Sequence, residues 1–197
     1  MRLYCLRFST NVERVAMALA HKGLAVESIW IEPDDRSPVE RISSQRLVPV
    51  LDDDGHVVAD STAILEYLEQ RHPEPPLYPR DEARRAEMAL YIDWFNQVVK
   101  RPPNEIEAEL LRDEPDQKRI DTLAAAMQGN LNRHEALLTA RDYLFGEFSA
   151  GDCAAFPFLK YALARETADD ELFHRILDDY QTARRAAAAC GLDQARR

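Results

Sequence analysis

The architecture of the chain is set by residues 47–65, which read LVPVLDDDGHVVADSTAIL. The apolar run Leu47–Leu51 and the pair Val57–Val58 predict two short strands. Between them lies Asp52–Gly55, whose Asp-Gly dipeptide is a strong signal for a tight hairpin turn. Asp60–Ser61 then supplies side-chain oxygens that favour the start of a helix, and apolar residues follow at helical spacing. This stretch therefore predicts a β-β-α unit.

Upstream of this unit the pattern is strand, helix, strand. Leu3–Leu6 is a short β-prone run, and apolar residues then recur at helical spacing over 12–19. That helix is predicted to end at Lys22–Gly23, a cation followed by the glycine that often closes a helix. Val26–Ile31 predicts a second strand, and residues 34–44 predict a loop with a short helix. The first part of the chain therefore reads β-α-β, a link, then β-β-α.

The chain changes character after residue 71. Residues 72–79 hold four of the eleven prolines, a density that no helix or strand interior tolerates, so they predict a linker. Beyond it the strand signal ends, and apolar residues recur in four helical stripes. The stripes begin at Leu90, Ile120, Phe158 and Leu172. We therefore predict an α/β domain over residues 1–78 and an all-α helical bundle over residues 79–197.

Composition and charge exclude several classes of protein. Of the 197 residues, 46% are apolar, which is enough for a packed core. The net charge of −10 argues against nucleic-acid binding, which usually needs a basic face. No run approaches the ~20 apolar residues of a membrane span, and the N-terminus does not resemble a secretory signal. Three cysteines without metal-ligand spacing predict a reduced, cytoplasmic protein with no metal.

The order of elements and four motifs together resemble the cytosolic glutathione S-transferase family, in its serine-type, bacterial-like form. The motifs are residues 8–15, Leu47–Leu51, Asp60–Ile64 and Ser149–Asp152. Each is weak alone, but their order and spacing cover nearly the whole chain. The resemblance implies a thioredoxin-like, glutathione-binding N-terminal domain and an all-helical C-terminal domain. It also implies glutathione as co-substrate, a small hydrophobic electrophile and a homodimer.

Ser9 is the catalytic residue that the resemblance implies. It stands between a strand end and a helix N-terminus, where free N–H groups and the helix dipole stabilise an anion. In serine-type members the matching hydroxyl donates a hydrogen bond to the glutathione sulfur, which lowers the thiol pKa. Asn11 is a second or substitute donor. From the residues alone, without the resemblance, the favoured interpretation is that Ser9 or Asn11 only caps the helix.

The rest of the glutathione site falls on two segments. The Val48–Pro49 bond is expected to be cis, so that Val48 presents its backbone to an extended peptide. Ser61 is expected to hold the γ-glutamyl carboxylate and Asp60 the ammonium group. Leu47 stands where many members have Lys or Gln against the glycine carboxylate, and Asp60 replaces the usual Glu or Gln. The alternatives are structural: Pro49 protects a sheet edge and Ser61 caps a helix.

The electrophile pocket is expected between the two domains, where ligand sites commonly form. Phe8, Tyr91 and Trp94 are candidate lining residues, although an aromatic stripe at helical spacing is more often core. Gly151 stands where the family usually has alanine, a difference expected to cost under ~1 kcal/mol of helix stability. The five histidines show no mutual spacing of a site and are predicted at surface or helix-face positions.

Three functions are compatible with these sequence features. The leading hypothesis is a glutathione transferase that activates the glutathione thiol for attack on a small electrophile. The second is a non-catalytic, binding or regulatory protein on the same scaffold, which the departures at Leu47 and Asp60 favour. The third is a disulfide exchanger, which would need a reactive thiol at the position of Ser9, whereas Cys5 falls inside the first strand.

Overall fold

The chain divides into two compact units, Met1–Arg80 and Asp81–Arg197. A computed structural model describes residues 1–160. The first unit contains β1 (Arg2–Cys5), α1 (Thr10–His21), β2 (Glu27–Trp30), α2 (Ser37–Ser43), β3 (Val50–Asp53), β4 (His56–Ala59) and α3 (Ser61–Arg71). The predicted order of strands and helices is confirmed, including the short helix in the link.

The four strands form one mixed sheet in the order β2-β1-β3-β4. β1 is parallel to β2 and antiparallel to β3, and β3 and β4 form the predicted hairpin. The strand predicted to start at Leu47 starts instead at Val50. Pro49 has no N–H to donate to a neighbouring strand, so the regular pairing begins only after it. Val50 pairs with Tyr4 on one side and with Ala59 on the other.

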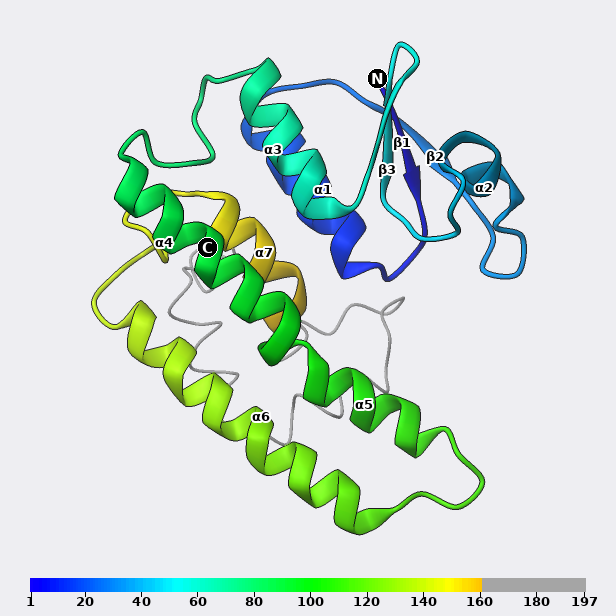
Figure 1. Ribbon diagram of the computed structural model, residues 1–197, viewed down its shortest axis with the longest axis vertical. Helices are drawn as coiled ribbons and strands as arrows, with labels where there is room; N and C mark the ends of the chain where they lie inside the picture. Colours follow the sequence, from blue (N-terminus) through cyan, green and yellow to red (C-terminus); the bar gives the residue numbers. More distant parts are fainter. Residues whose placement is uncertain (161–197) are drawn as a thin grey trace, which may run out of the picture. The chain divides into compact units, whose positions relative to one another are not determined.

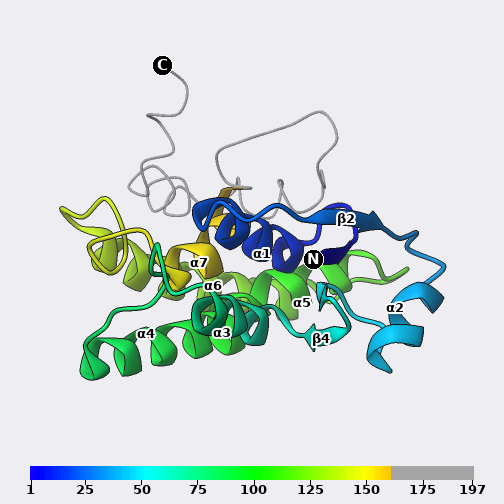
Figure 2. The same cartoon turned by 90° about the horizontal axis from the view of Figure 1, so that it is seen from above.

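Helices cover both faces of the sheet, with α1 and α3 on one face and α2 on the other (Figures 1 and 2). Successive side chains of a strand point to opposite faces, and this alternation divides the core. Tyr4 and Val50 pack with Val39 of α2. The paired residues Leu3 and Leu51 are also buried and therefore face α1 and α3.

The proline-rich segment 72–79 contains no helix or strand, as predicted, yet it is fastened to the first unit. The buried Lys22 ammonium donates to the Glu69 carboxylate at 2.9 Å and to the carbonyl oxygens of His72 and Pro75 at 2.6 and 2.9 Å. The Glu69 carboxylate also accepts the N–H of Leu77 at 2.9 Å, and Leu77 is buried. A buried charge pair thus organises a segment that has no regular structure.

In the described part of the second unit, all regular secondary structure is helical. It contains α4 (Glu82–Trp94), the π-helical turn η1 (Phe95–Val99), α5 (Arg101–Leu110), α6 (Gln117–Leu138) and α7 (Ala150–Leu159). α6 runs alongside α5 and η1, and α4 packs against α7 (Figure 1). Within these residues no helix is long and apolar enough to cross a membrane.

The predicted helical stripes supply part of the core of the second unit. Tyr91 and Phe95 from the first stripe and Met127 from the second are buried. Leu90 and Val98 are exposed instead, because the buried face of α4 and η1 passes through Met88, Ile92 and Val99. The stripe predicted from Leu172 lies outside the described residues.

The start of α7 has the capping arrangement that the sequence predicted. The Asp152 carboxylate accepts the N–H of Ser149 at 2.9 Å, its hydroxyl at 2.7 Å and the N–H of Leu144 at 3.0 Å. Within the same turn, a Cβ placed on Gly151 would lie 2.6 Å from Cε2 of Phe145. The helix-stability cost expected at this position stays a prediction, but the glycine also has a packing role, because it makes room for the Phe145 ring.

Candidate functional site

Ser9 lies at the N-terminus of α1, directly after β1 and a short turn. Its Oγ accepts the N–H of Val12 at 3.3 Å, so Ser9 is the N-cap of the helix. Because Oγ is the acceptor in this contact, the hydroxyl hydrogen can be donated to another group. Asn11 lies in the first turn of the same helix and is half-buried.

Phe8, the residue before Ser9, has an unusual backbone conformation. Its φ angle is +63°, in the left-handed region that bulky residues rarely adopt, and its side chain is 50% exposed. Such a conformation costs roughly 1–3 kcal/mol and is concentrated at functional sites. The turn that presents Ser9 is therefore held in place at an energetic cost, with an aromatic ring left open to solvent.

The Val48–Pro49 peptide bond is cis, as expected. Pro49 is buried, Val48 is half-buried, and Leu47 is 76% exposed. The side-chain amide of Gln45 closes on the backbone of Leu47: it donates to the Leu47 carbonyl at 2.9 Å and accepts the Leu47 N–H. The residue before the Val-Pro pair is therefore fixed by its backbone, with its side chain in solvent.

Asp60 and Ser61 form the N-terminus of α3. The Asp60 carboxylate accepts the N–H groups of Thr62 and Ala63 at 2.8 and 3.1 Å, and its φ angle is +77°. Ser61 is buried, and its Oγ accepts a hydrogen bond from Nη1 of Arg14 at 3.2 Å. Arg14, only 2% exposed, brings a buried positive charge from α1 to the first residue of α3.

These three segments meet at one end of the sheet (Figure 1). Val50, at the start of β3, pairs with Tyr4 near the end of β1 and with Ala59 at the end of β4. The turn after β1 carries Ser9, and the segment after β4 carries Ser61. Two helix N-termini and the Arg14 guanidinium thus create positive potential at an edge that also offers the backbone of Val48. Such an arrangement suits an extended, anionic peptide.

The two other candidate pocket residues belong to the second unit. Tyr91 is 8% exposed, and its hydroxyl lies 3.1 Å from Nδ1 of His134. Trp94 is half-buried, with its ring centroid 5.9 Å from that of Tyr91, and it directly precedes η1. Within its own unit, Tyr91 lies in an aromatic cluster with Phe95 and Phe145.

Two buried polar residues were not singled out by the sequence. His134 was predicted at a surface or helix-face position, but it is fully buried against Tyr91 and Phe95. Burial lowers its pKa from the usual 6.5 to about 4. Arg14 is likewise buried, within the amphipathic helix α1. The available signal was helical spacing: Arg14 lies four residues before the core residue Ala18, and His134 lies four residues before Leu138.

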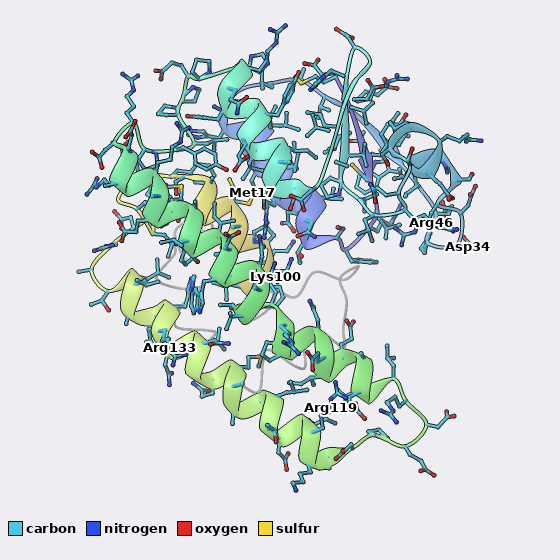
Figure 3. The ribbon with its side chains drawn as sticks, in the orientation of Figure 1. Met17, Asp34, Arg46, Lys100, Arg119 and Arg133 are labelled. Atoms are coloured by element: carbon cyan, nitrogen blue, oxygen red, sulfur yellow. The ribbon has the colours of Figure 1, made fainter. Side chains whose placement is uncertain are left out.

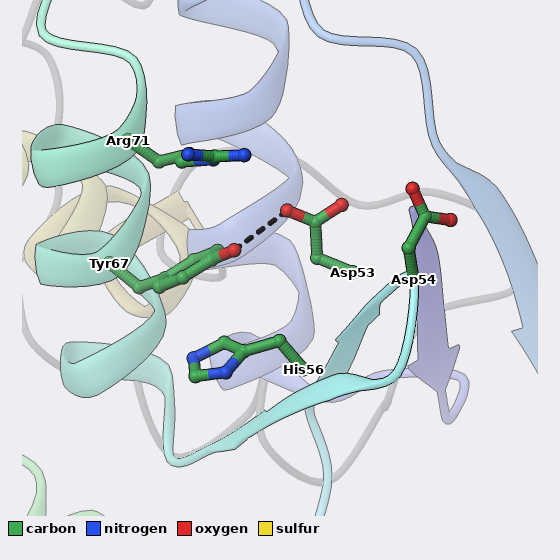
Figure 4. Close-up of a pocket in the computed structure, with 5 residues that line it drawn as sticks. All are labelled: Asp53, Asp54, His56, Tyr67 and Arg71. Carbon is green, nitrogen blue, oxygen red and sulfur yellow. Dashed lines mark hydrogen bonds between the residues drawn. The ribbon is translucent and has the colours of Figure 1, made fainter.

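A second polar feature of the first unit lies at the opposite end of the hairpin (Figure 4). This cavity of about 340 Å³ is lined by Asp53, Asp54, His56, Tyr67 and Arg71. The Tyr67 hydroxyl donates to the Asp53 carboxylate at 2.7 Å, and this contact raises the pKa of Tyr67. Since it lies beside the β3–β4 turn, it is separate from the end that carries Ser9 and Ser61.

Other chemistries find less support in the described residues. Cys5 is 2% exposed, and burial raises the pKa of its thiol, so the reactive thiolate is disfavoured. Among residues 1–160, no group of three or more His, Cys, Asp or Glu side chains is arranged to hold a metal ion.

Comparison with known proteins gives the family of the chain. A family model described as "Glutathione S-transferase, N-terminal domain" matches residues 3–76. FtsZ-localized protein A of Caulobacter vibrioides is 32% identical over 72% of this chain and 68% of its own length. Maleylacetoacetate isomerase of Pseudomonas aeruginosa is 40% identical over 44% of each chain. The chain spans 40–44% of the length of six of its curated relatives.

Solved structures match over nearly the whole length. A glutathione S-transferase from Methylobacterium radiotolerans, in complex with glutathione sulfonate, is 28% identical with a TM-score of 0.72. The match covers 95% of this chain and 92% of that one, so it includes residues of both units. A thioredoxin-like unit with a cis Val-Pro bond and two helix N-termini at one sheet end, followed by a helical unit, agrees with these matches. The chain belongs to the cytosolic glutathione S-transferase family.

Proposed function

We propose that this protein is a glutathione transferase, which activates the glutathione thiol for attack on a small hydrophobic electrophile. One observation carries the proposal: Ser9, Val48 and Ser61 come from three separate segments and meet at one end of the sheet. Each offers what one part of glutathione needs. In the related structure from Methylobacterium radiotolerans, the bound molecule is glutathione sulfonate.

Ser9 is the proposed thiol-activating residue. Its Oγ is held by the Val12 N–H, which fixes the oxygen and leaves the hydroxyl hydrogen to be donated to sulfur. A hydrogen bond to the charged form favours that form, so it lowers the thiol pKa. The N-terminus of α1 adds positive potential in the same place. Asn11, two residues further on, is the proposed second donor.

The remaining contacts hold the tripeptide. Val48 is proposed to pair with the cysteinyl residue as an added strand. Ser61 and the N-terminus of α3 are proposed to take the γ-glutamyl carboxylate, and the buried Arg14 guanidinium behind Ser61 supports that charge. Asp60 is proposed to take the ammonium group. Its carboxylate already accepts two N–H groups of α3, which orients it.

The role of Ser9 is tested by titrating the thiolate absorbance of bound glutathione. Ser9→Ala is expected to raise the pKa of the bound thiol by roughly one unit, the size of one charge-assisted hydrogen bond. Asn11→Ala shows whether the two residues share the task. Ser37→Ala, at the start of α2, is the matched control and should leave the thiol pKa unchanged. Equal pKa values in wild type and Ser9→Ala would remove Ser9 from this role.

A second candidate is a binding or regulatory protein on the same scaffold. It is favoured by the match to FtsZ-localized protein A, a relative named for where it is found and not for a reaction. No shift of the melting temperature in millimolar glutathione would argue against the transferase, because a ligand that binds the folded state stabilises it. We propose a cytoplasmic homodimer for either candidate function. Light scattering, which measures the mass of the protein in solution, checks the dimer.

A further inference from the structure

Leu47 is an unusual residue for the edge of a peptide-binding site. It is the most exposed large apolar side chain among residues 1–160, at 76%. Its backbone N–H and C=O are both engaged by the side-chain amide of Gln45. A ligand lying over this residue therefore meets the isobutyl group and finds no free backbone donor at position 47.

The strand register shows which part of a ligand reaches Leu47. The N-terminus of α3 follows Ala59, and Ala59 pairs with Val50. Along the chain from Val50, the backbone passes Val48 and then Leu47, away from Ser61. An extended thiol peptide that places one carboxylate at Ser61 and its cysteinyl residue at Val48 therefore continues over Leu47 with its C-terminal end.

Two of the three arginines nearest in sequence to Leu47 have partners on the α2 side. Nη1 of Arg46 lies 3.8 Å from the Glu40 carboxylate, and Figure 3 shows Arg46 in the part of the first unit that carries α2. Nε of Arg36 donates to the carbonyl of Pro33 at 3.0 Å. Segment 32–47 also carries four carboxylates against three arginines. A carboxylate placed over Leu47 would thus lose water without gaining a dedicated cation.

We infer that this protein takes γ-glutamylcysteinyl thiols whose C-terminal end is uncharged at least as well as it takes glutathione. Leu47 is the residue that sets this specificity. The inference rests on the proposed glutathione site and names the class of thiol that the site accepts. An exposed leucine gains by covering an apolar ester or amide, whereas it offers nothing to a carboxylate.

The test compares glutathione with glutathione esterified by ethanol at its glycine carboxyl. Binding is measured by calorimetry, and turnover is measured with a common electrophile. In the wild type, the two dissociation constants are expected to agree within about twofold, or to favour the ester. Leu47→Lys should shift the preference about fivefold toward glutathione, the effect of one partly exposed ion pair. Leu111→Lys puts the same charge on an exposed leucine of the second unit and should leave the ratio unchanged.

Two results would overturn the inference. One is a wild type that binds glutathione more tightly than its ester by more than about twofold. If Arg46→Ala then abolished that preference, Arg46 would be the residue that reads the carboxylate. The other is binding of neither thiol, which would overturn the proposed function as well. Binding of both thiols without turnover would reject only the proposed activity, and the ratio of dissociation constants would still decide the role of Leu47.

Discussion

Lys22 in the first unit and His134 in the second are both buried polar residues, but their surroundings differ. The Lys22 ammonium makes three contacts, one to a carboxylate and two to carbonyl oxygens, and these bind a segment without regular structure. His134 has one polar contact, from Nδ1 to Tyr91, while its buried Nε2 has no hydrogen-bond partner among the described residues. Aromatic rings surround it.

This difference predicts which kind of change destabilises each unit. A buried charge pair is strongly destabilised when one partner is removed, because the other charge is left unpaired. An imidazole in an apolar cluster is stable there only while it is neutral, because burying an unpaired charge is costly. We therefore expect that removing a buried side chain lowers the unfolding free energy of the first unit, and that acidification lowers that of the second.

The largest effect is expected for Lys22→Met. Removing the ammonium leaves the buried Glu69 carboxylate without its countercharge, although it keeps the Leu77 N–H, and removes a donor from two carbonyl groups. This should cost roughly 3–5 kcal/mol of unfolding free energy. Urea titration measures it through Trp30 fluorescence in a Trp94→Phe background, where Trp30 is the only tryptophan left. Lys118→Met, at an exposed lysine of α6, is the control and should change the unfolding free energy by less than about 0.5 kcal/mol. A loss below about 1 kcal/mol for Lys22→Met would contradict the comparison.

A smaller effect is expected from acidification through His134. Its pKa is about 4 in the folded state against 6.5 when exposed, so the unfolded state binds the proton more readily. The contribution of the neutral His134 side chain to the unfolding free energy is therefore fully present above pH 6.5. It is lost as the pH falls toward 4, and the loss amounts to roughly 2–4 kcal/mol. Urea titrations at several pH values, followed through Trp94 in a Trp30→Phe background, measure the loss.

His134→Leu should remove that part of the pH dependence. His56→Gln, at an exposed histidine of β4, should retain it. If the wild type and His134→Leu lost stability in parallel between pH 6.5 and 4, the imidazole would not be the group responsible.

The smallest effect tests the packing of the aromatic cluster. Gly151→Ala would bring a methyl group 2.6 Å from the Phe145 ring, which packs edge-on against Tyr91 at 5.6 Å. We expect a loss of about 1–3 kcal/mol in thermal unfolding. Gly129→Ala is the matched control, because no neighbouring atom of residues 1–160 outside its own helical turn lies within 4 Å of its added Cβ. It should raise stability by up to about 1 kcal/mol. Equal effects of the two substitutions would show that the Phe145 ring moves away from the added methyl group at little cost in free energy.

The local features of the fold could be predicted from the sequence because they depend on neighbouring residues. The Asp54–Gly55 turn, the cap at Ser9 and the paired Ser149 and Asp152 are all written within a few positions. Lys22 and Glu69 lie 47 residues apart, as do Arg14 and Ser61. The residues that flank these positions do not predict either contact, so only the structure reveals them.

The candidate site divides in the same way. Ser9, Pro49 and Ser61 were identified through a resemblance of motifs, and the strand register explains why they meet. The exposure of Leu47 and its hold by Gln45 could not be read from the sequence, since a strand was expected to begin there. The burial of Tyr91 against His134 required knowledge of which face of α6 meets α4.

The contacts of Lys22 also bear on how the protein can be divided for experiments. A fragment cut after α3, at Arg71, would lack the carbonyl oxygens of His72 and Pro75, so that of the three contacts of the ammonium only the one to Glu69 would remain. Glu74 is also paired with Arg80, beyond the proline-rich segment. An expression fragment meant to isolate the α/β unit should therefore run through Arg80, and an affinity tag or fusion junction belongs after that residue.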